Sequence, residues 1–353
     1  MANKWLKSLK KADDILDFDF NPHAMENTTE APTPYFGWML ASPSNKIPSG
    51  ANFLFGAEPK SGKSLLAMSM VNRILESDPT GESVAIYINS EGRAALQGNL
   101  IKKELQDRVI MKDSNDPVAI FDWLHDDVRP MVVDDKMPLK IIVIDSLSSI
   151  TGIKRQAAES VAQHLMGDQA MTLQLGLQRL NWLRRNNIHL VATVQMRANM
   201  EAGSYGPKSK FQASFAVRHY FDYFISLSRA GAADDKKNVF DQAYEDSDLK
   251  DARGNKLLNG HKIYMKVTES SIGPAGRSGV ITMSYDSGIV DTWEEIYLLG
   301  KNLGIAKTEN NRTYEFQGQK FNGKKELAMA IRDNDELGKA ILSEVRKLDA
   351  HKI

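Results

Sequence analysis

Residues 51–70 read ANFLFGAEPKSGKSLLAMSM, and this stretch decides the fold. It begins with an apolar run, Ala51–Phe55, passes through a loop containing glycine and serine, and enters a segment with helical spacing, Lys63–Glu76. Four residues separate Ala57 from Gly62-Lys63-Ser64, which is the spacing of a phosphate-binding loop with alanine at the usual first glycine. Strand, tight loop and helix in this order predict a site where backbone N–H groups and the helix N-terminus hold phosphates.

The residue types in this loop have specific expected roles. Lys63 is expected to reach the β and γ phosphates of ATP, and Ser64 to place its hydroxyl on Mg²⁺. An ordinary turn that caps a helix is the alternative, but the flanking strand and helix favour a nucleotide site. The nucleotide-binding residues predicted from the loop are Glu58, Pro59, Lys60, Ser61, Gly62, Lys63, Ser64 and Leu65.

Two carboxylates follow other apolar runs of the chain. Asp145 ends the run Lys140–Ile144, and Glu91 lies just after the run Ser83–Ile88. Because parallel strands end at one edge of an open sheet, we expect both side chains beside the phosphate loop. Asp145 is predicted to orient Mg²⁺ together with Ser64, and Glu91 to position the water that attacks ATP. Alternatively, Asp145 caps a turn and Glu91 is a surface residue.

The wider pattern is α/β. Short apolar runs, with His189–Val194 as the fourth, alternate with helical segments at Pro117–Val128 and about 160–185. This alternation predicts a mostly parallel central sheet covered on both faces. The last helix carries an apolar stripe of Leu173, Leu177, Leu180 and Leu183. Later runs are predicted to form an antiparallel extension: Tyr223–Leu227, Lys262–Val267 and Gly279–Tyr285.

The chain divides into three predicted parts. Residues 1–35 form an N-terminal arm, which is either a frayed terminus or a polymerisation element that docks on a neighbouring subunit through Ile15, Phe18 or Phe20. Residues 36–285 form the core, with a surface insertion at 230–260 that is rich in Gly, Asn and Asp. Residues 286–353 are predicted to form a small α+β domain with a β pair at Thr313–Phe316 and Gln319–Phe321.

Composition excludes several functions. The 353 residues include no cysteine, so disulfides, thiolate zinc sites and cysteine nucleophiles are absent. There is no apolar run long enough for a membrane span and no apolar signal segment at the N-terminus, so the expected location is cytoplasmic. The formal net charge is zero, which argues against a general DNA-coating protein and requires any DNA contact to be local.

The loop and the two strand-end carboxylates, in this order and spacing, resemble the RecA family of DNA recombinases. The resemblance continues at Thr193-Val-Gln195-Met-Arg197, which looks like the glutamine switch through which the family senses the γ-phosphate. Met166-Gly167 looks like the end of a first DNA loop at about 152–167, and residues 198–217 fill the place of a second. The match covers roughly residues 40–335 and is closer to phage UvsX-type recombinases than to bacterial RecA.

This resemblance implies a RecA-type ATPase core with ATP and Mg²⁺, and Lys63, Glu91 and Gln195 as catalytic residues. It implies a helical homo-oligomer on single-stranded DNA that exchanges strands with double-stranded DNA in a DNA-dependent ATPase cycle. A single-strand-binding or mediator protein is a further implied partner, and a bacterial host cell the compartment if the chain is phage-encoded. The alternatives are a ring-forming helicase with the same core and a filament or annealing protein that does not hydrolyse ATP.

The second loop has the chemistry of a DNA contact. Cations neutralise phosphates, and aromatic rings stack on bases or wedge between them. The alternative is a solvated loop whose aromatic side chains pack on the core, but a position directly after Gln195 favours DNA. The predicted DNA-binding residues are Arg197, Tyr205, Lys208, Lys210, Phe211 and Arg218, with Lys154 and Arg155 as weaker candidates in the first loop.

Two departures from the family pattern concern the nucleotide. Family members carry basic residues before the Gly-Pro turn that reach a neighbour's ATP, but here Glu269 and Ser271 occupy that stretch. Lys266 or Arg277 is therefore left as the candidate for this cation. Residues 92–101 also lack the aromatic residue on which bacterial members stack adenine.

Overall fold

The computed structural model describes the chain from residue 28 to residue 350 with internal gaps. The described ranges are 28–42, 45–92, 100–157, 167–198, 209–211, 213–229, 238–240, 246–250, 256–258, 260–285, 287–308 and 312–350. Ile15, Phe18 and Phe20 of the predicted arm lie outside these ranges. The end of the arm pairs β1 (Thr28–Thr29) with β2 (Ile47–Pro48) and begins α3 (Pro34–Met39), which crosses the predicted boundary at residue 35.

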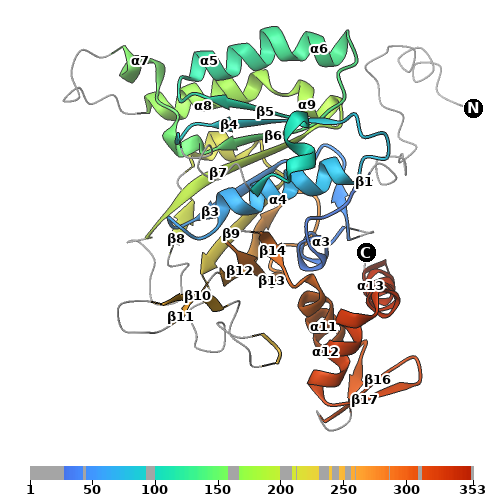
Figure 1. The fold of residues 1–353 in the computed structure, drawn as a ribbon. Helices are drawn as coiled ribbons and strands as arrows, with labels where there is room; N and C mark the ends of the chain where they lie inside the picture. Colours follow the sequence, from blue (N-terminus) through green and yellow to red (C-terminus); the bar gives the residue numbers. More distant parts are fainter. Residues whose placement is uncertain are drawn as a thin grey trace, which may run out of the picture.

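A large mixed sheet forms the centre of the α/β fold (Figure 1). Six strands from β9 to β5 run parallel, and β12, β13 and β14 continue the sheet antiparallel. In spatial order the strands are β14 (Gly288–Val290), β13 (Ser278–Ser284), β12 (Gly260–Ser270), β9 (Tyr223–Arg229), β3 (Phe53–Ala57), β7 (His189–Ala198), β6 (Leu139–Asp145), β4 (Val84–Asn89) and β5 (Val109–Asp113), with β8 (Ser209–Phe211) paired to β7.

The predicted parallel core and antiparallel extension are confirmed, with one correction. Tyr223–Leu227, predicted as part of the extension, lies in β9 and runs parallel to β3, and only its other edge is antiparallel to β12. The first three residues of β9 are buried, as expected for a strand of a parallel sheet that is covered on both faces. β9 is therefore the strand at which the sheet changes from parallel to antiparallel pairing.

Helices cover both faces of the sheet, because alternate residues of each strand face opposite sides. Phe53 and Phe55 belong to the core beneath α4 (Lys63–Glu76) and α3, whereas Leu54 belongs to the opposite core. That second core is closed by α5 (Pro117–Asp122), η3 (Trp123–Val128), α6 (Arg129–Val133), α8 (Asp168–Arg179) and α9 (Trp182–Arg185), the helices at the top of Figure 1.

The predicted helices exist where the structure describes the chain. α4 has the predicted bounds, and Pro117–Val128 forms α5 and η3, with α6 continuing the helical segment. In the segment predicted at about 160–185, α8 begins at Asp168 after Gly167 adopts a left-handed conformation, and it ends before α9; residues 160–166 lie outside the described ranges. The predicted stripe is confirmed as core, because Leu173, Leu177, Leu180 and Leu183 are all buried.

Several short strands and helices complete the part of the chain between residues 36 and 285. The insertion at 230–260 contributes an antiparallel ribbon of β10 (Asp246–Lys250) and β11 (Lys256–Leu258). The remaining short helices are η2 (Lys103–Arg108), η4 (Leu147–Ser149), α7 (Ile153–Gln156) and α10 (Phe215–Arg218). Across the described ranges, no helix has both the length and the apolar character that crossing a bilayer requires.

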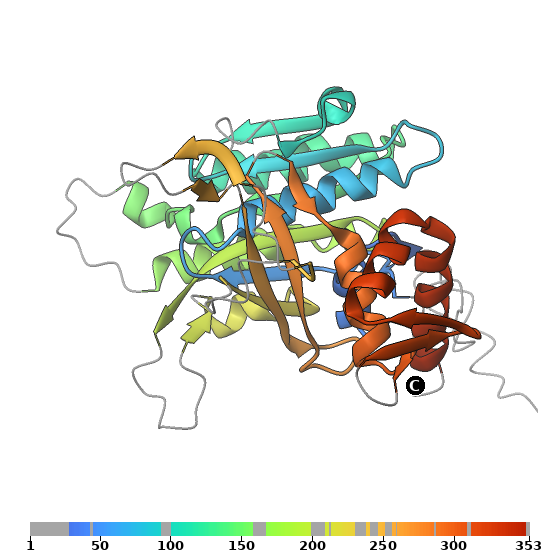
Figure 2. The ribbon, with the colours of Figure 1, turned by 60° about the horizontal axis from the view of Figure 1, so that its bottom comes forward.

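The C-terminal part has its own hydrophobic core beside the sheet extension (Figure 2). The predicted β pair is confirmed as β16 (Thr313–Phe316) and β17 (Gln319–Asn322), and β15 (Lys307–Thr308) adds a third strand. The surrounding helices are α11 (Thr292–Asn302), α12 (Lys324–Asp333) and α13 (Asp335–Ala350). Because α11 follows β14 after a single residue, the C-terminal unit is attached closely to the sheet.

A buried carboxylate joins this unit to α3. The backbone N–H of Tyr35 donates to Glu295 Oε2 at 2.9 Å, and Oε1 is buried with no partner among the described residues. Burial raises the pKa of Glu295 from its usual 4.5 to about 8. The side chain is therefore neutral at pH 7 and would charge only in alkaline solution.

Stability should consequently fall as the pH rises. Between about pH 4.5 and pH 8 the folded state keeps a proton that the unfolded chain releases, so the free energy of unfolding falls by up to about 1.4 kcal/mol per pH unit. Glu295→Gln removes this dependence, and the variant should be more stable than wild type at pH 8 but not at pH 5. Urea unfolding of both proteins at pH 5 and pH 8 measures this. If the difference in free energy of unfolding between variant and wild type were the same at both pH values, the prediction would be wrong.

Candidate nucleotide site

The predicted phosphate loop connects β3 to α4 at the carboxyl edge of the parallel strands. Lys60 and Gly62 have φ angles of 63° and 85°, so the loop turns tightly before the helix begins. The left-handed φ of Gly62 favours glycine, and a Cβ atom there would also lie 2.2 Å from Ile263 Cδ1 of β12. With 14 residues, α4 presents free backbone N–H groups and a positive dipole end to a phosphate.

The Lys63 side chain folds back across this loop. Its ammonium group donates to the carbonyl oxygens of Ala57 at 3.1 Å and Glu58 at 3.2 Å. Burial lowers the pKa of Lys63, while the nearby Asp145 and Glu91 oppose that shift. The positive charge is thus held at the mouth of the loop between two carboxylates, where an anionic phosphate would be attracted.

Asp145 ends β6 at the same edge and is buried. The hydroxyl of Tyr87, on β4, donates to Asp145 Oδ2 at 2.7 Å, and the hydroxyl of Thr193, on β7, donates to Oδ1. Both oxygens of the Asp145 carboxylate are therefore held by donors from the two flanking strands. The peptide bond from Asp145 to Ser146 is cis.

Glu91 and Gln195 complete the arrangement. Ser146 Oγ donates to Glu91 Oε1 at 2.8 Å, and the backbone N–H of Gln195 donates to Ser148 Oγ at 3.1 Å. The segment after β6 thus touches both residues. The predicted catalytic residues and most of the loop line one cleft of about 710 Å³. Its lining residues are Pro59, Lys60, Ser61, Gly62, Lys63, Ser64, Leu65, Asn89, Ser90, Glu91, Asn115, Asp145, Ser149, Gln195, Arg229, His261, Met283 and Tyr285.

One wall of this cleft was not predicted. Tyr285, just after β13, accepts hydrogen bonds from Arg229 Nη2 at 3.2 Å and shares one with His261 Nδ1 at 3.0 Å. The Tyr285 and His261 rings are 5.4 Å apart and present aromatic surface to the cleft. These residues come from the antiparallel extension, and only the order of strands in the sheet brings them to the phosphate loop, so no local pattern signals them.

The cleft suits a nucleoside triphosphate with Mg²⁺. The loop supplies amides and a cation, Ser64 and Asp145 supply oxygens, and the Tyr285 wall offers a ring for a base. Within the described ranges, no group of three Asp, Glu or His side chains could hold a metal ion unaided. Mg²⁺ is usually bound by few carboxylates together with phosphates, so this donor set fits a metal carried by the nucleotide.

The predicted DNA-binding residues are only partly brought together. Arg197 is exposed on β7 and pairs in register with Lys210 of β8, while Lys154 is exposed on α7, which also contains Arg155. Tyr205 and Lys208 lie outside the described ranges.

The other two residues are half-buried and have partners within the protein. The Phe211 ring packs edge-on against Phe224 at 5.7 Å, so it joins the core. Arg218 forms an ion pair with Glu269, and its guanidinium lies 5.1 Å from the centre of the Phe224 ring. In both cases the hydrophobic surface of β9 provides the partner.

Lys266 and Arg277, the candidate cations before and after the Gly-Pro turn, differ in whether they contact other residues of the chain. Arg277 Nη1 donates to the carbonyl oxygen of Trp38 at 2.8 Å, and its guanidinium lies 4.9 Å from the centre of the Trp38 ring. Lys266 is exposed on β12, and no ion pair to it is found among the described residues. Lys266 is therefore the candidate that can reach another molecule.

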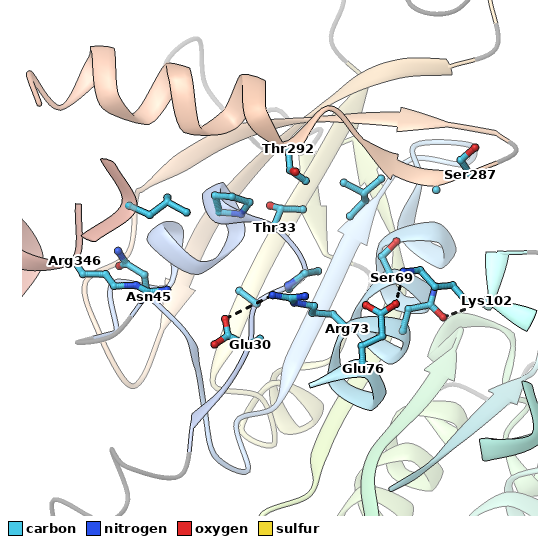
Figure 3. A pocket seen from close by; sticks show the side chains of 17 residues that line it. Glu30, Thr33, Asn45, Ser69, Arg73, Glu76, Lys102, Ser287, Thr292 and Arg346 are labelled. Atoms are coloured by element: carbon cyan, nitrogen blue, oxygen red, sulfur yellow. Dashed lines mark hydrogen bonds and ion pairs between the residues drawn. The ribbon is translucent and has the colours of Figure 1, made fainter. Parts of the chain in front are cut away.

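A second cavity, of about 360 Å³, lies where α4 meets the residues after β1 and the C-terminal unit (Figure 3). Its two carboxylates are already paired: Glu30 with Lys46 at 2.7 Å and Arg73 at 3.9 Å, and Glu76 with Lys102. None of the predicted catalytic residues lines this cavity. The cleft at the phosphate loop, and not this cavity, gathers the predicted catalytic residues.

Comparison with known proteins adds no assignment: neither the family models nor the curated proteins that were searched match this sequence. The assignment of function therefore depends on the geometry of the cleft.

Proposed function

We propose that the protein binds and hydrolyses ATP with a RecA-type core and acts as a DNA recombinase in filaments on single-stranded DNA. The observation that carries this proposal is the meeting of Lys63, Asp145, Glu91 and Gln195 in one cleft at the carboxyl edge of the sheet. The loop after β3, the segment after β4, the end of β6 and the middle of β7 contribute these residues, so segments far apart in the sequence meet here. A turn that merely caps a helix would not gather them.

Each residue has a step in the proposed hydrolysis. The loop amides and Lys63 bind the triphosphate, and Glu91 orients the attacking water, held in place by Ser146. Mg²⁺, when bound with the nucleotide, neutralises charge on the phosphates. Gln195 faces the same cleft and continues into the β7–β8 hairpin, so a contact to the γ-phosphate would be passed along one strand.

The register of that hairpin supports an anionic partner. Two basic residues, Arg197 and Lys210, are partners in the antiparallel register of β7 and β8. Basic residues are the side chains that neutralise DNA phosphates. The hairpin is therefore proposed as the element that ATP binding stabilises and that then contacts DNA. Residues 199–208, which join its strands, lie outside the described ranges.

Subunits are proposed to stack head to tail, an arrangement that extends as a helix when it does not close. Lys266 is the proposed cation for the neighbour's nucleotide, because Arg277 is committed to Trp38. The arm around Ile15, Phe18 and Phe20 is the proposed docking element. A single-strand-binding or mediator protein would be a further partner in this scheme.

Negative-stain electron microscopy with single-stranded DNA and a slowly hydrolysed ATP analogue tests this proposal. Continuous helical filaments that need the nucleotide are expected. Closed rings would instead favour the helicase, and filaments without any ATP turnover would favour an annealing protein. Strand exchange between a single strand and a homologous duplex then measures the proposed activity directly.

The Tyr285 wall is proposed to bind the adenine base. Tyr285→Ala should weaken ATP binding by roughly tenfold, because stacking on an aromatic ring contributes about 1–3 kcal/mol per base. Inorganic triphosphate has no base and should bind both proteins equally. Calorimetric titration with the two ligands makes this comparison, and an equal loss for both would place the base elsewhere.

A further inference from the structure

The Tyr87 hydroxyl lies at the centre of the site although its ring belongs to the core. Tyr87 is fully buried on β4, and its hydroxyl donates to Asp145 Oδ2 at 2.7 Å. The phenol hydroxyl therefore contacts the aspartate that ends β6, one of the two residues proposed to lie around Mg²⁺.

Packing alone does not require this hydroxyl. The ring belongs to the apolar cluster beneath α4, where phenylalanine would supply the same buried surface. A buried hydroxyl costs about 1–3 kcal/mol unless it is hydrogen-bonded, so its presence needs a polar function.

Thr193 provides the matching contact on the other side. Its hydroxyl donates to Asp145 Oδ1, so the two carboxylate oxygens are held from β4 and from β7. A carboxylate has about four lone-pair positions, and two donors leave the others available. With both oxygens held, the carboxylate cannot rotate away from the loop without breaking a buried hydrogen bond. Its free lone pairs thus keep one orientation.

We propose that Tyr87 is a positioning residue: together with Thr193 it holds the Asp145 carboxylate in the orientation that receives Mg²⁺. This inference rests on the proposed function, because it concerns the metal carried by the nucleotide. Hydrogen bonds to metal ligands from such supporting residues commonly change metal affinity by about 10–100-fold.

Tyr87→Phe tests the inference through metal dependence and not through turnover. The affinity of the full chain for a fluorescent, non-hydrolysable ATP analogue is measured in EDTA and at increasing Mg²⁺. The variant should bind the metal-free analogue within about twofold of wild type, but need roughly 10-fold more Mg²⁺ for the half-maximal increase in affinity. Tyr223→Phe is the matched control, because Tyr223 is equally buried in the sheet and its hydroxyl donates to the carbonyl of Leu40 at 3.3 Å.

The outcomes separate the inference from the function beneath it. A folded Tyr87→Phe protein with the Mg²⁺ dependence of wild type overturns the inference, and so does an equal loss with and without Mg²⁺, which would mean that Tyr87 only supports the loop. Wild-type protein that binds no nucleotide under any condition overturns the proposed function as well. Should Tyr87→Phe not fold, Thr193→Val removes the other donor and should shift the Mg²⁺ requirement in the same direction.

Discussion

Replacing Lys63 with alanine is expected to weaken ATP binding by roughly 100-fold and to abolish measurable hydrolysis. The ammonium group is the cation that crosses the loop, with carbonyl contacts at 3.1 and 3.2 Å that a phosphate would replace. Truncating one partner of a buried, hydrogen-bonded charge pair costs about 2–5 kcal/mol, and 100-fold corresponds to about 2.7 kcal/mol. Equilibrium binding of a fluorescent ATP analogue and phosphate release measure the two effects.

The control for this experiment is Lys339→Ala. Lys339 is exposed on α13, where it pairs with Glu336 at 2.8 Å, and it does not line the cleft. That variant should bind and hydrolyse ATP as wild type does. A Lys63→Ala protein that hydrolysed ATP at the wild-type rate would remove the basis for the site assignment.

Glu91→Gln should separate binding from hydrolysis. The amide keeps an oxygen for the Ser146 hydroxyl, so the loop geometry and ATP affinity should stay within a few-fold of wild type. The attacking water loses the carboxylate that accepts its proton, and general-base catalysis contributes about 10²–10⁴-fold to rate. We therefore expect kcat to fall by at least roughly 100-fold, measured as single-turnover phosphate release.

This variant also tests the coupling to DNA. If hydrolysis releases DNA, complexes of Glu91→Gln with single-stranded DNA should persist in ATP under conditions in which wild-type complexes dissociate. Glu104→Gln, an exposed glutamate of η2, makes the same chemical change away from the cleft. Hydrolysis by Glu91→Gln as fast as that of the Glu104→Gln control would assign the base to another residue.

The parts of the fold with strong local patterns were predictable from the sequence. The run before Ala57 and the helix Lys63–Glu76 combine burial with clear periodicity, and both occur as expected. β5 had no such pattern because it is an edge strand whose Ile110 and Met111 are exposed. Edge strands lack the continuous apolar run that identifies a central strand.

The residues of the candidate site also fall into those that a local sequence pattern indicates and those that it does not. Lys63, Glu91, Asp145 and Gln195 each follow a recognisable strand, and the parallel order of strands brings them to one edge. Tyr285 follows an antiparallel strand that meets the loop only through the order of strands in the sheet, so the sequence alone could not place it. The contacts of Phe211 with Phe224 and of Arg277 with Trp38 join residues far apart in the sequence, so only the structure shows them.

The contact between β3 and β8 has a mechanical consequence. A Cβ atom on Gly56 would lie 2.3 Å from Phe211 Cε1, so the Phe211 ring rests directly on bare backbone one residue before the phosphate loop begins. Closely packed interiors have low compressibility and transmit displacement. A displacement of the end of β3 is therefore expected to move the Phe211 ring, and with it β8. Because Gly56 has no side chain between its backbone and the ring, such a displacement would pass directly from one strand to the other.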